Sequence, residues 1–456
     1  MLLALHAVAP QRARNALLLA ASLLFYAWGE GEYVLLMLFS IGLNHRFGLW
    51  LHARGPRFDK GVIAFALVIN LGLLGLFKYF GFAVENLRAL GFDLPLLDPV
   101  HMPIGISFFT FHAISYLIDI YRGKAKAQRS VIDFALYIAL FPQLVAGPIV
   151  RYHELVHQLG KRELSVARFA EGTRRFIFGL AKKMLIANTV AATATTVFKL
   201  PAGALRPQDA WLGAVCYTIQ IYFDFSGYSD MAVGLGKMFG FDFPENFNYP
   251  YIAQSVSEFW RRWHITLSNW FRDYLYIPLG GNRRGRAREA FNLVTVFFLC
   301  GLWHGASWTF ILWGLYHGAF LVLERVGLSS LLVRTFRPLR HLYLLLVVVI
   351  GWVLFRAPDL SSALAMLAAM SGKAAAAGSA PVLEALDGSV LLALACAAVF
   401  ATPVLPFLAA HRERLRGPAL GFTLRSLELG GLALLLFASC MQVAANTYNP
   451  FIYYRF

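Results

Sequence analysis

The sequence predicts an all-α, polytopic integral membrane protein. Of its 456 residues, 58% are hydrophobic and only 14% are charged, whereas soluble domains carry about 25% charged residues. Apolar runs long enough to span a bilayer recur along the chain, and they predict about eleven membrane segments. Inside hydrocarbon every backbone polar group must be satisfied within the protein, and runs of this length indicate helices rather than strands.

The expected segments lie near residues 15–29, 33–52, 61–84, 103–121, 131–150, 176–198, 210–240, 291–323, 341–357, 389–409 and 427–446. The helix of segment 131–150 is expected to stop or kink at Gly147-Pro148. The run 291–323 would be roughly 50 Å long as one helix, but the hydrocarbon core is about 30 Å thick. We therefore expect a break near Gly301 and Gly305, which would place His304 beside irregular backbone.

The net charge of +16 does not indicate a nucleic-acid partner. The basic residues concentrate in loops between apolar runs, as the positive-inside rule requires, so membrane lipid is the expected surroundings and nucleic acid is not. The segment 151–183 is basic and is expected to form amphipathic helices on the membrane surface. The four cysteines lie in apolar stretches without paired spacing, and they predict neither disulfides nor a metal site.

The stretch 244–313 stands apart from the other segments. Its first half mixes Glu258, Arg261 and His264 with many aromatic residues, and its second half is apolar around His304. An ionisable side chain at membrane depth is costly unless it faces a cavity or a partner. Imidazole is also the usual general base near neutral pH. His304 is therefore the first functional candidate.

Two motifs in this stretch are EFWRRWH (258–264) and LWHGASW (302–308). They resemble the motifs of the membrane-bound O-acyltransferase family, in particular the branch that O-acetylates bacterial polysaccharides such as alginate. Further motifs of the family follow in order, namely PIGISFFTFHAISYLIDIYRG (103–123), LFPQLVAGPIVRYHEL (140–155), YFDFSGYSDMAVGLGKMFGF (222–241), NFNYPY (246–251) and DYLYIPLGGNR (273–283). We therefore expect one membrane-embedded domain over 1–456, with its motif-bearing core at about 103–318 and re-entrant or amphipathic helices around a central tunnel.

The resemblance implies a multi-pass enzyme of the bacterial inner membrane. It would move an acetyl group from a cytoplasmic thioester, with acetyl-CoA as the expected donor substrate and no bound cofactor, towards an exported polysaccharide. The implied partners are a periplasmic acetyltransferase and the polysaccharide export machinery. Peptidoglycan, cellulose and teichoic acid, the last by D-alanylation, stay open as alternative polymers.

The family motif implies that His304 is the catalytic base. It implies a second active-site role for His264, which would polarise the thioester carbonyl or position the acceptor. Acyl transfer to a hydroxyl needs a base, donors for the developing oxyanion and exclusion of water. We further expect that the substrate tunnel is lined by Trp303, Trp260, Arg261, Asn269, Asp224 and Tyr228.

Two further patterns concern the donor and its chemistry. Arg283 and Arg284 could pair with the phosphates of coenzyme A, although a positive-inside loop explains them as well. Cys300 lies four residues before His304, so a continuous helix would place the two on one face. Cys300 could then carry the acetyl group as a covalent intermediate. The residues around Cys300 are apolar, however, and apolar surroundings disfavour the thiolate, so we expect direct transfer with His304 as base.

Two alternatives belong to other functional classes. His153, Glu154 and His157 match the H-E-x-x-H pattern of zinc proteases. Their segment, RYHELVHQLGKRE, is polar like a surface helix rather than apolar like an intramembrane site, and the pattern arises easily by chance. A passive carrier is the other alternative. Zinc content tests the first, and transport without acyl turnover would indicate the second.

Overall fold

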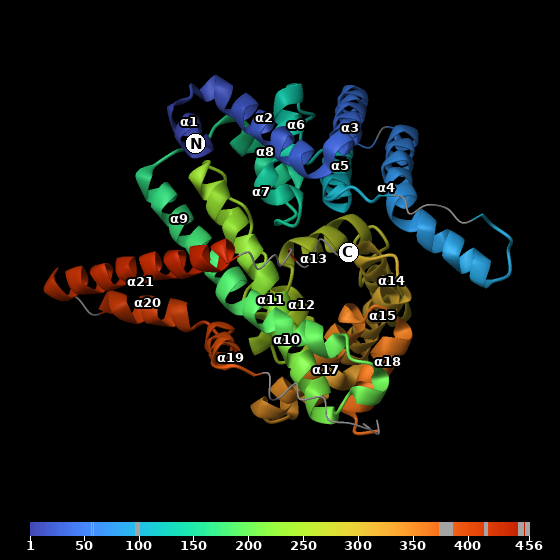
Figure 1. Cartoon of the computed structure of the whole chain (residues 1–456). Coiled ribbons are helices and arrows are strands. Elements are labelled where there is room, and N and C mark those ends of the chain that lie inside the picture. The colour runs from blue at the N-terminus through green and yellow to red at the C-terminus, as the bar shows by residue number, and fades with distance from the viewer. Residues whose placement is uncertain are drawn as a thin grey trace. The chain divides into compact units, whose positions relative to one another are not determined.

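The computed structural model describes residues 1–55, 57, 59–95, 101–373, 386–414, 418–445 and 451. Within these ranges all regular structure is helical, which confirms the all-α class (Figure 1). The chain divides into two compact units. Unit 1 comprises Met1–Thr173, Ala232–Glu245 and Arg272–Tyr274, and unit 2 comprises Arg174–Met231, Asn246–Phe271 and Leu275–Phe456.

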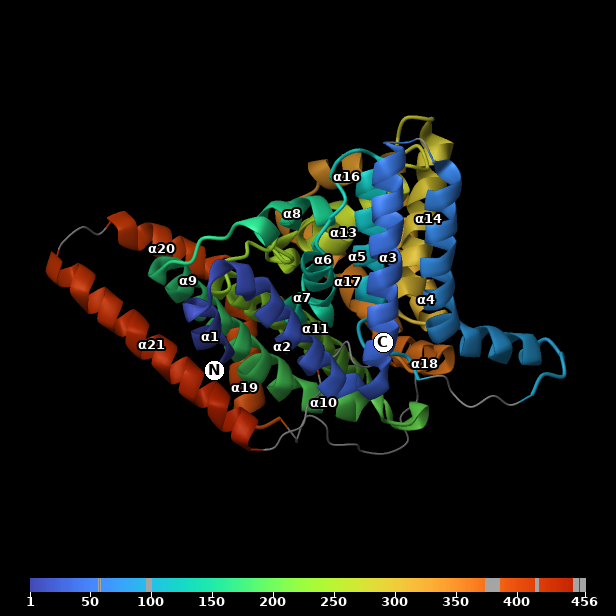
Figure 2. The same cartoon turned by 90° about the horizontal axis from the view of Figure 1, so that it is seen from above.

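Unit 1 is built on a group of long helices. Its elements are α1 (Leu2–Val8), α2 (Gln11–Glu30), η1 (Gly31–Tyr33), α3 (Val34–Arg54), α4 (Lys60–Ala89), α5 (Ile106–Tyr121), α6 (Val131–Ala139), α7 (Phe141–Leu144) and α8 (Tyr152–Gly160). Helices α3, α4 and α5 pack side by side (Figure 2). A Cβ at Gly48 of α3 would lie only 2.2 Å from the hydroxyl of Tyr116 in α5, so glycine is what lets these two helices approach closely.

The expected segment 131–150 is not one helix. Helix α6 ends at Ala139, Leu140 leaves the helical conformation with φ −56° and ψ 112°, and α7 is only four residues long. Pro142 explains the break, because it lacks a backbone N–H and its ring would clash with the carbonyl of Ile138 in a continuous helix. The predicted stop at Gly147-Pro148 was therefore wrong, since the helix ends earlier.

Unit 2 holds the second half of the chain. Its elements are η2 (Lys182–Ala187), α10 (Asn188–Phe198), η3 (Ala202–Ala204), η4 (Pro250–Ile252), α12 (Val256–Arg262), α13 (Ile265–Phe271), α14 (Arg286–His304), α15 (Trp308–Leu323), η6 (Glu324–Leu328), α16 (Ser329–Arg334), α17 (Arg337–Arg356), α18 (Leu360–Met370), α19 (Gly388–Phe400), α20 (Val404–Arg414) and α21 (Pro418–Ala444). Helices α9 (Val166–Ala181) and α11 (Pro207–Met238), and the short η5 (Arg272–Tyr276), contribute residues to both units.

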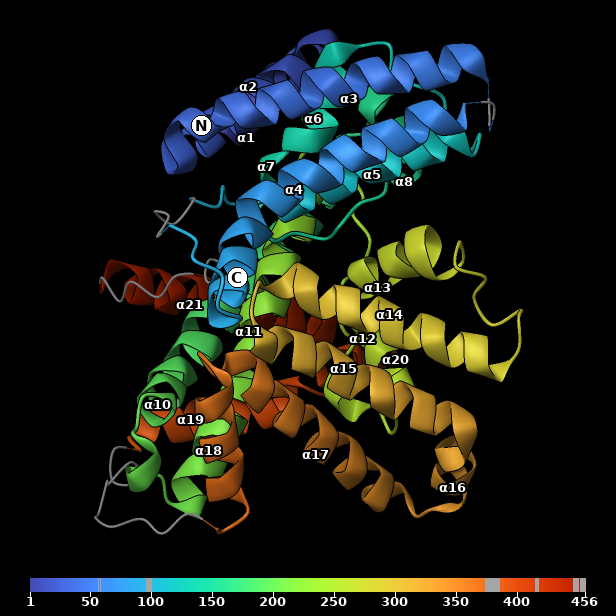
Figure 3. The same cartoon turned by 90° about the vertical axis from the view of Figure 1, so that its right-hand side faces the viewer.

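The expected break in 291–323 is confirmed, and it falls directly after His304. Helix α14 ends at His304, and α15 begins at Trp308. The two helices pack closely, with α17 on the other side of α15 (Figure 3). A Cβ at Gly301 would lie 2.3 Å from the carbonyl oxygen of Phe310, and one at Gly314 would lie 2.2 Å from that of Phe297. Both glycines are therefore required by this packing.

Fewer helices are suited to span a membrane than the sequence predicted. By length and composition the described residues contain six such helices, or seven if the bent pair α19–α20 counts as one span, rather than about eleven. Helix α5 has 16 residues, so it is about 24 Å long and shorter than the hydrocarbon core. The stretch Val166–Phe198 is one of the six. Its first part, α9, is amphipathic, as expected for the basic segment 151–183, and the apolar part begins near residue 176, where the sequence predicted a membrane segment.

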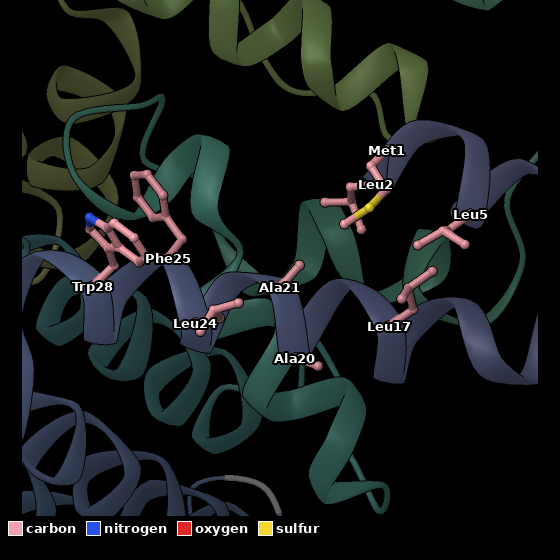
Figure 4. A pocket seen from close by; sticks show the side chains of 9 residues that line it. All are labelled: Met1, Leu2, Leu5, Leu17, Ala20, Ala21, Leu24, Phe25 and Trp28. Carbon is pink, nitrogen blue, oxygen red and sulfur yellow. The ribbon is translucent and has the colours of Figure 1, made fainter.

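One apolar cavity of about 510 Å³ lies between α1 and α2 in unit 1. Its lining includes Leu5 and Leu17 at one end and Phe25 and Trp28 at the other (Figure 4). The lining offers no carboxylate, hydroxyl or imidazole. The cavity therefore has no group suited to acid–base or nucleophilic chemistry, and the candidate residues lie elsewhere.

Candidate active site

His304 closes helix α14 in unit 2. Gly305 is extended after it, and the Ser307 side chain caps α15 by accepting a hydrogen bond from the Thr309 backbone N–H at 3.2 Å. The imidazole is 4% exposed. Its ring centroid lies 5.1 Å from the ring of Trp313 and 5.1 Å from that of Phe355. The break between the helices thus leaves a histidine at a helix end inside an aromatic cluster.

His264 joins α12 to α13 and is fully buried. Its φ of 43° lies in the left-handed region, which a non-glycine residue seldom adopts. Strained backbone of this kind persists only where the surroundings impose it, and it concentrates at functional sites. His264 lies outside the candidate membrane-spanning helices. Burial lowers its pKa to about 3, so the ring is neutral at physiological pH.

Two carboxylates hold the start of α12. The Ser255 hydroxyl caps the helix by accepting from the Glu258 backbone N–H at 3.1 Å, and the Glu258 carboxylate accepts from the N–H of Gln254, the residue before the cap, at 2.9 Å. The buried carboxylate of Glu324 accepts from the Val256 N–H at 2.6 Å and the Ser257 N–H at 2.9 Å. Helix α12, whose C-terminal end leads into His264, is therefore anchored at its N-terminus.

Asn246 is the hydrogen-bonding partner of His264. Its Oδ1 lies 3.0 Å from Nδ1 of His264 and 2.9 Å from the hydroxyl of Thr266, and it accepts from the Thr266 backbone N–H at 3.3 Å. Its Nδ2 donates to the hydroxyl of Ser229 at 3.0 Å. Among the residues that the structure describes, Nε2 of His264 has no hydrogen-bonding partner. The ring is thus fixed at one nitrogen and unused at the other.

Trp303 has both imidazoles as neighbours. Its ring centroid lies 6.2 Å from that of His264 and 4.9 Å from that of His304. Trp313 contacts His304 and also lies 5.7 Å from Trp260. Four residues that the sequence singled out, His264, His304, Trp303 and Trp260, therefore belong to one buried aromatic cluster of unit 2.

The other predicted site residues have different surroundings. Asp224 is 1% exposed and forms an ion pair with Lys183, and the Tyr228 ring lies 4.6 Å from that of Phe451. Arg261 is exposed, and its Nε donates to the carbonyl of Ser257 on the same helix.

Three polar residues complete the predicted set. Asn269 is half-buried on α13. Arg283 and Arg284 are exposed in the turn before α14. Their contact with coenzyme A stays a prediction, as does the tunnel-lining role of Arg261 and Asn269.

Sequence reasoning did not single out Asn246, Ser229, Thr266 or Glu324. Asn246 opens the NFNYPY motif, so its neighbourhood was recognised while its contact with His264 was not. Glu324 lies 68 residues from Val256, the first residue of the helix that it caps. Partners separated in this way leave no periodic pattern in the sequence.

The H-E-x-x-H segment forms helix α8 in unit 1. Nδ1 of His153 lies 2.7 Å from Oδ2 of Asp119, a fully buried carboxylate that also accepts from the hydroxyl of Tyr274 at 2.9 Å. Glu154 pairs with Arg151, and His157 is exposed. Across the described ranges of the chain no group of three or more His, Cys, Asp or Glu side chains could hold a metal ion. The contacts of α8 are those of a scaffold helix.

Residues 106–367 match the model of the membrane-bound O-acyltransferase family. The chain belongs to this family. The acyltransferase is 41% identical to a probable alginate O-acetylase of Azotobacter vinelandii, over the whole of this chain and 97% of the relative. It is 42% identical to a probable alginate O-acetylase of Pseudomonas putida, again over the whole chain and 97% of the relative.

A third relative acts on a different polymer. The acyltransferase is 38% identical to a peptidoglycan O-acetyltransferase of Helicobacter pylori, over 78% of this chain and 73% of the relative. Family membership, together with the apolar helices, identifies the protein as a membrane-embedded O-acyltransferase. The buried histidine cluster lies within the matched residues.

Proposed function

We propose that this acyltransferase moves an acetyl group from a thioester, with acetyl-CoA as donor substrate, to a hydroxyl acceptor for the O-acetylation of an exported polysaccharide such as alginate. The polymer is proposed from the two relatives that align over the whole chain and are described as probable alginate O-acetylases. The observation that carries the chemistry is the pair of buried histidines that share Trp303 as a neighbour.

His304 is the proposed general base. As a hydroxyl of the acceptor attacks the thioester carbonyl carbon, its proton passes to the imidazole of His304 and a new C–O bond forms. Collapse of the tetrahedral intermediate then breaks the C–S bond, and the proton returns to the departing thiolate. Exposures of 4% for His304 and 0% for His264 support this step, because water that reached the site would hydrolyse the thioester.

The proposal places the enzyme in a bacterial inner membrane. The donor enters from the cytoplasm, and the acetyl group leaves on the opposite side, directly to the polymer or first to a periplasmic acetyltransferase. The basic loops support this orientation, since cytoplasmic loops carry the excess of Lys and Arg.

Peptidoglycan is the second candidate acceptor. It is supported by the similarity to the peptidoglycan O-acetyltransferase, although that match covers less of the chain than the alginate relatives do. The chemistry at His304 would be the same for both polymers, so only the acceptor distinguishes them.

The test uses purified protein in vesicles that enclose either alginate oligosaccharides or peptidoglycan fragments. Acetyl-CoA labelled in the acetyl group is added outside. We expect release of free CoA thiol and, with alginate inside, alkali-labile label on the oligosaccharide. Label on peptidoglycan fragments alone would assign the second candidate.

The matched controls are His304→Ala and His157→Ala. His157 is an exposed histidine in unit 1, so its removal tests whether loss of any histidine matters. Thiol release by the wild type no faster than by His304→Ala would refute the use of acetyl-CoA. Equal loss in both variants would refute the assignment of the base.

A further inference from the structure

We infer that Asn246 holds His264 as the Nδ1–H tautomer, so that Nε2 of His264 accepts a hydrogen bond from a hydroxyl of the acceptor substrate. Asn246 is then a positioning residue. This assignment rests on the proposed acetyl transfer, and it opposes the alternative in which His264 donates to the thioester carbonyl.

The backbone fixes where Asn246 and His264 meet. The Ile265 N–H donates to the Asn246 carbonyl at 2.9 Å, and the Asn248 N–H donates to the Arg262 carbonyl at 2.9 Å. The segment that carries Asn246 is therefore paired with the turn that carries His264. The contact between their side chains does not depend on a mobile loop.

The orientation of the Asn246 amide follows from a backbone donor. Asparagine oxygen and nitrogen are assigned from their hydrogen bonds. The Thr266 N–H lies 3.3 Å from the Asn246 atom that faces His264, and a backbone N–H can only donate. That atom is consequently the oxygen, and the amide nitrogen is used by Ser229 at 3.0 Å.

The tautomer of His264 follows in turn. Its Nδ1 lies 3.0 Å from the Asn246 oxygen, so Nδ1 carries the proton. A neutral imidazole has a single N–H, which leaves Nε2 as an acceptor. The burial that lowers the pKa of His264 to about 3 also opposes a second proton. A neutral ring in this state cannot donate from Nε2 to a carbonyl.

The unused Nε2 is the second observation that indicates a ligand. It is buried, and no partner for it occurs in the part of the chain that the structure describes. Buried polar atoms are almost always hydrogen-bonded, so Nε2 needs a donor that the described side chains do not provide. A hydroxyl is such a donor, whereas a thioester offers only acceptors at its carbonyl.

The tautomer itself is tested by ¹⁵N NMR on histidine-labelled full-length protein in lipid. The protonated and unprotonated nitrogens of a neutral imidazole have well-separated ¹⁵N shifts, and the spectrum of His264→Gln identifies the signals of His264. We expect Nδ1 protonated and Nε2 bare across pH 5–8. A protonated Nε2 would overturn the inference, whatever the protein acetylates.

The role is tested by two variants of similar size, Asn246→Asp and Asn246→Leu. Aspartate keeps the acceptor for Nδ1–H, but its charge favours the imidazolium and raises the pKa of His264. We expect Asn246→Asp to remain active at pH 8 and to lose activity as the pH falls, because a protonated Nε2 cannot accept. Asn246→Leu should lose about tenfold or more at every pH, since nothing selects the tautomer.

Thiol release from acetyl-CoA and transfer to alginate oligosaccharides are both measured. An Asn246→Asp enzyme whose transfer rises as the pH falls would show that Nε2 acts as a donor, and the inference would be wrong. Full activity of Asn246→Leu would also overturn it. If the wild type releases no thiol while NMR shows a bare Nε2, the proposed function fails and the tautomer stands.

Discussion

Each unit of the molecule contains a histidine whose Nδ1 is held by a side chain, and the two partners differ. In unit 1, Nδ1 of His153 lies 2.7 Å from the carboxylate of Asp119, and the side chain is 28% exposed. In unit 2, Nδ1 of His264 lies 3.0 Å from the amide oxygen of Asn246, and the residue is 0% exposed. The His153–Asp119 pair contains a carboxylate, whereas both side chains of the His264–Asn246 pair are neutral.

The difference teaches what each pair does. Asp119 also accepts from the Tyr274 hydroxyl and the His153 backbone N–H, so its oxygens connect α5, α8 and η5. These three hydrogen bonds serve packing between helices. Asn246 brings no charge that would stabilise an imidazolium, and Nε2 of His264 stays available. A carboxylate partner here builds a scaffold, whereas an amide partner leaves a neutral imidazole for chemistry.

The largest effect is expected in unit 2, at the proposed base His304. His304→Ala should lower acetyl transfer by about 100-fold or more, because it removes the proposed base. Its amount in the membrane should stay near that of the wild type. His153→Ala together with His157→Ala should affect turnover per folded molecule far less. The assay is thiol release from acetyl-CoA, normalised to folded protein. Inactivity of the double variant in folded protein would reverse the roles of the two units.

His264→Gln should give a smaller loss, on the order of tenfold to 100-fold. The glutamine carbonyl can still accept a hydrogen bond, although it cannot reproduce the ring contacts with Phe225 and Trp303. Initial rates at saturating acetyl-CoA measure the effect, and His264→Ala is the reference without an acceptor. If Gln and Ala are equally inactive, hydrogen bonding at this position is not what matters.

In unit 1 the expected effect is on stability. Asp119→Ala leaves the Tyr274 hydroxyl and Nδ1 of His153 without their acceptor, which should lower the free energy of unfolding by about 1–3 kcal/mol. Thermal unfolding in detergent measures it, with Asp387→Ala as the control. Asp387 is an exposed cap of α19, and its loss should lower the stability less than the loss of Asp119 does. Normal stability of Asp119→Ala with lost turnover would contradict the scaffold role.

The neutral state of His264 predicts a flat pH response from this residue. Its pKa is lowered, so the neutral ring persists until the pH falls to about 3, and transfer that depends on it is not lost between pH 5 and 8. The pH profile of the wild type, compared with that of His264→Gln, isolates the contribution. An acid limb near pH 6 that disappears in His264→Gln would contradict the burial argument.

Cys300→Ala should have the smallest effect, with activity within about twofold of the wild type. Helix α14 continues through His304 and breaks only after it, so Cys300 and His304 share a helix face. Cys300 is 5% exposed in apolar surroundings, where a thiol is inert. A folded Cys300→Ala protein as inactive as His304→Ala would instead establish an acetyl-cysteine relay.

Local patterns in the sequence were sufficient to predict the all-α membrane class and to single out His264 and His304 as site residues. The deficit of charge and the recurring apolar runs indicate membrane helices. Both features involve only residues that are close in the sequence, so they can be recognised without the fold. Gly301 and Gly305 likewise predict a break in the run 291–323, and the structure places it directly after His304. Pro142 is a local signal of the same kind, because proline ends a helix from its own position in the sequence, and it breaks the segment 131–150.

Only the tertiary structure decided which nitrogen of His264 is occupied and what holds the ring. Asn246 is 18 residues away from His264, and Glu324 is 68 residues from the helix start that it caps. Hydrogen bonds between such residues depend on how the chain returns on itself, which hydropathy and helical periodicity do not encode. Short sequence motifs therefore predict that His264 and His304 belong to a site. Which nitrogen of His264 donates and which accepts depends on the tertiary contacts of the ring.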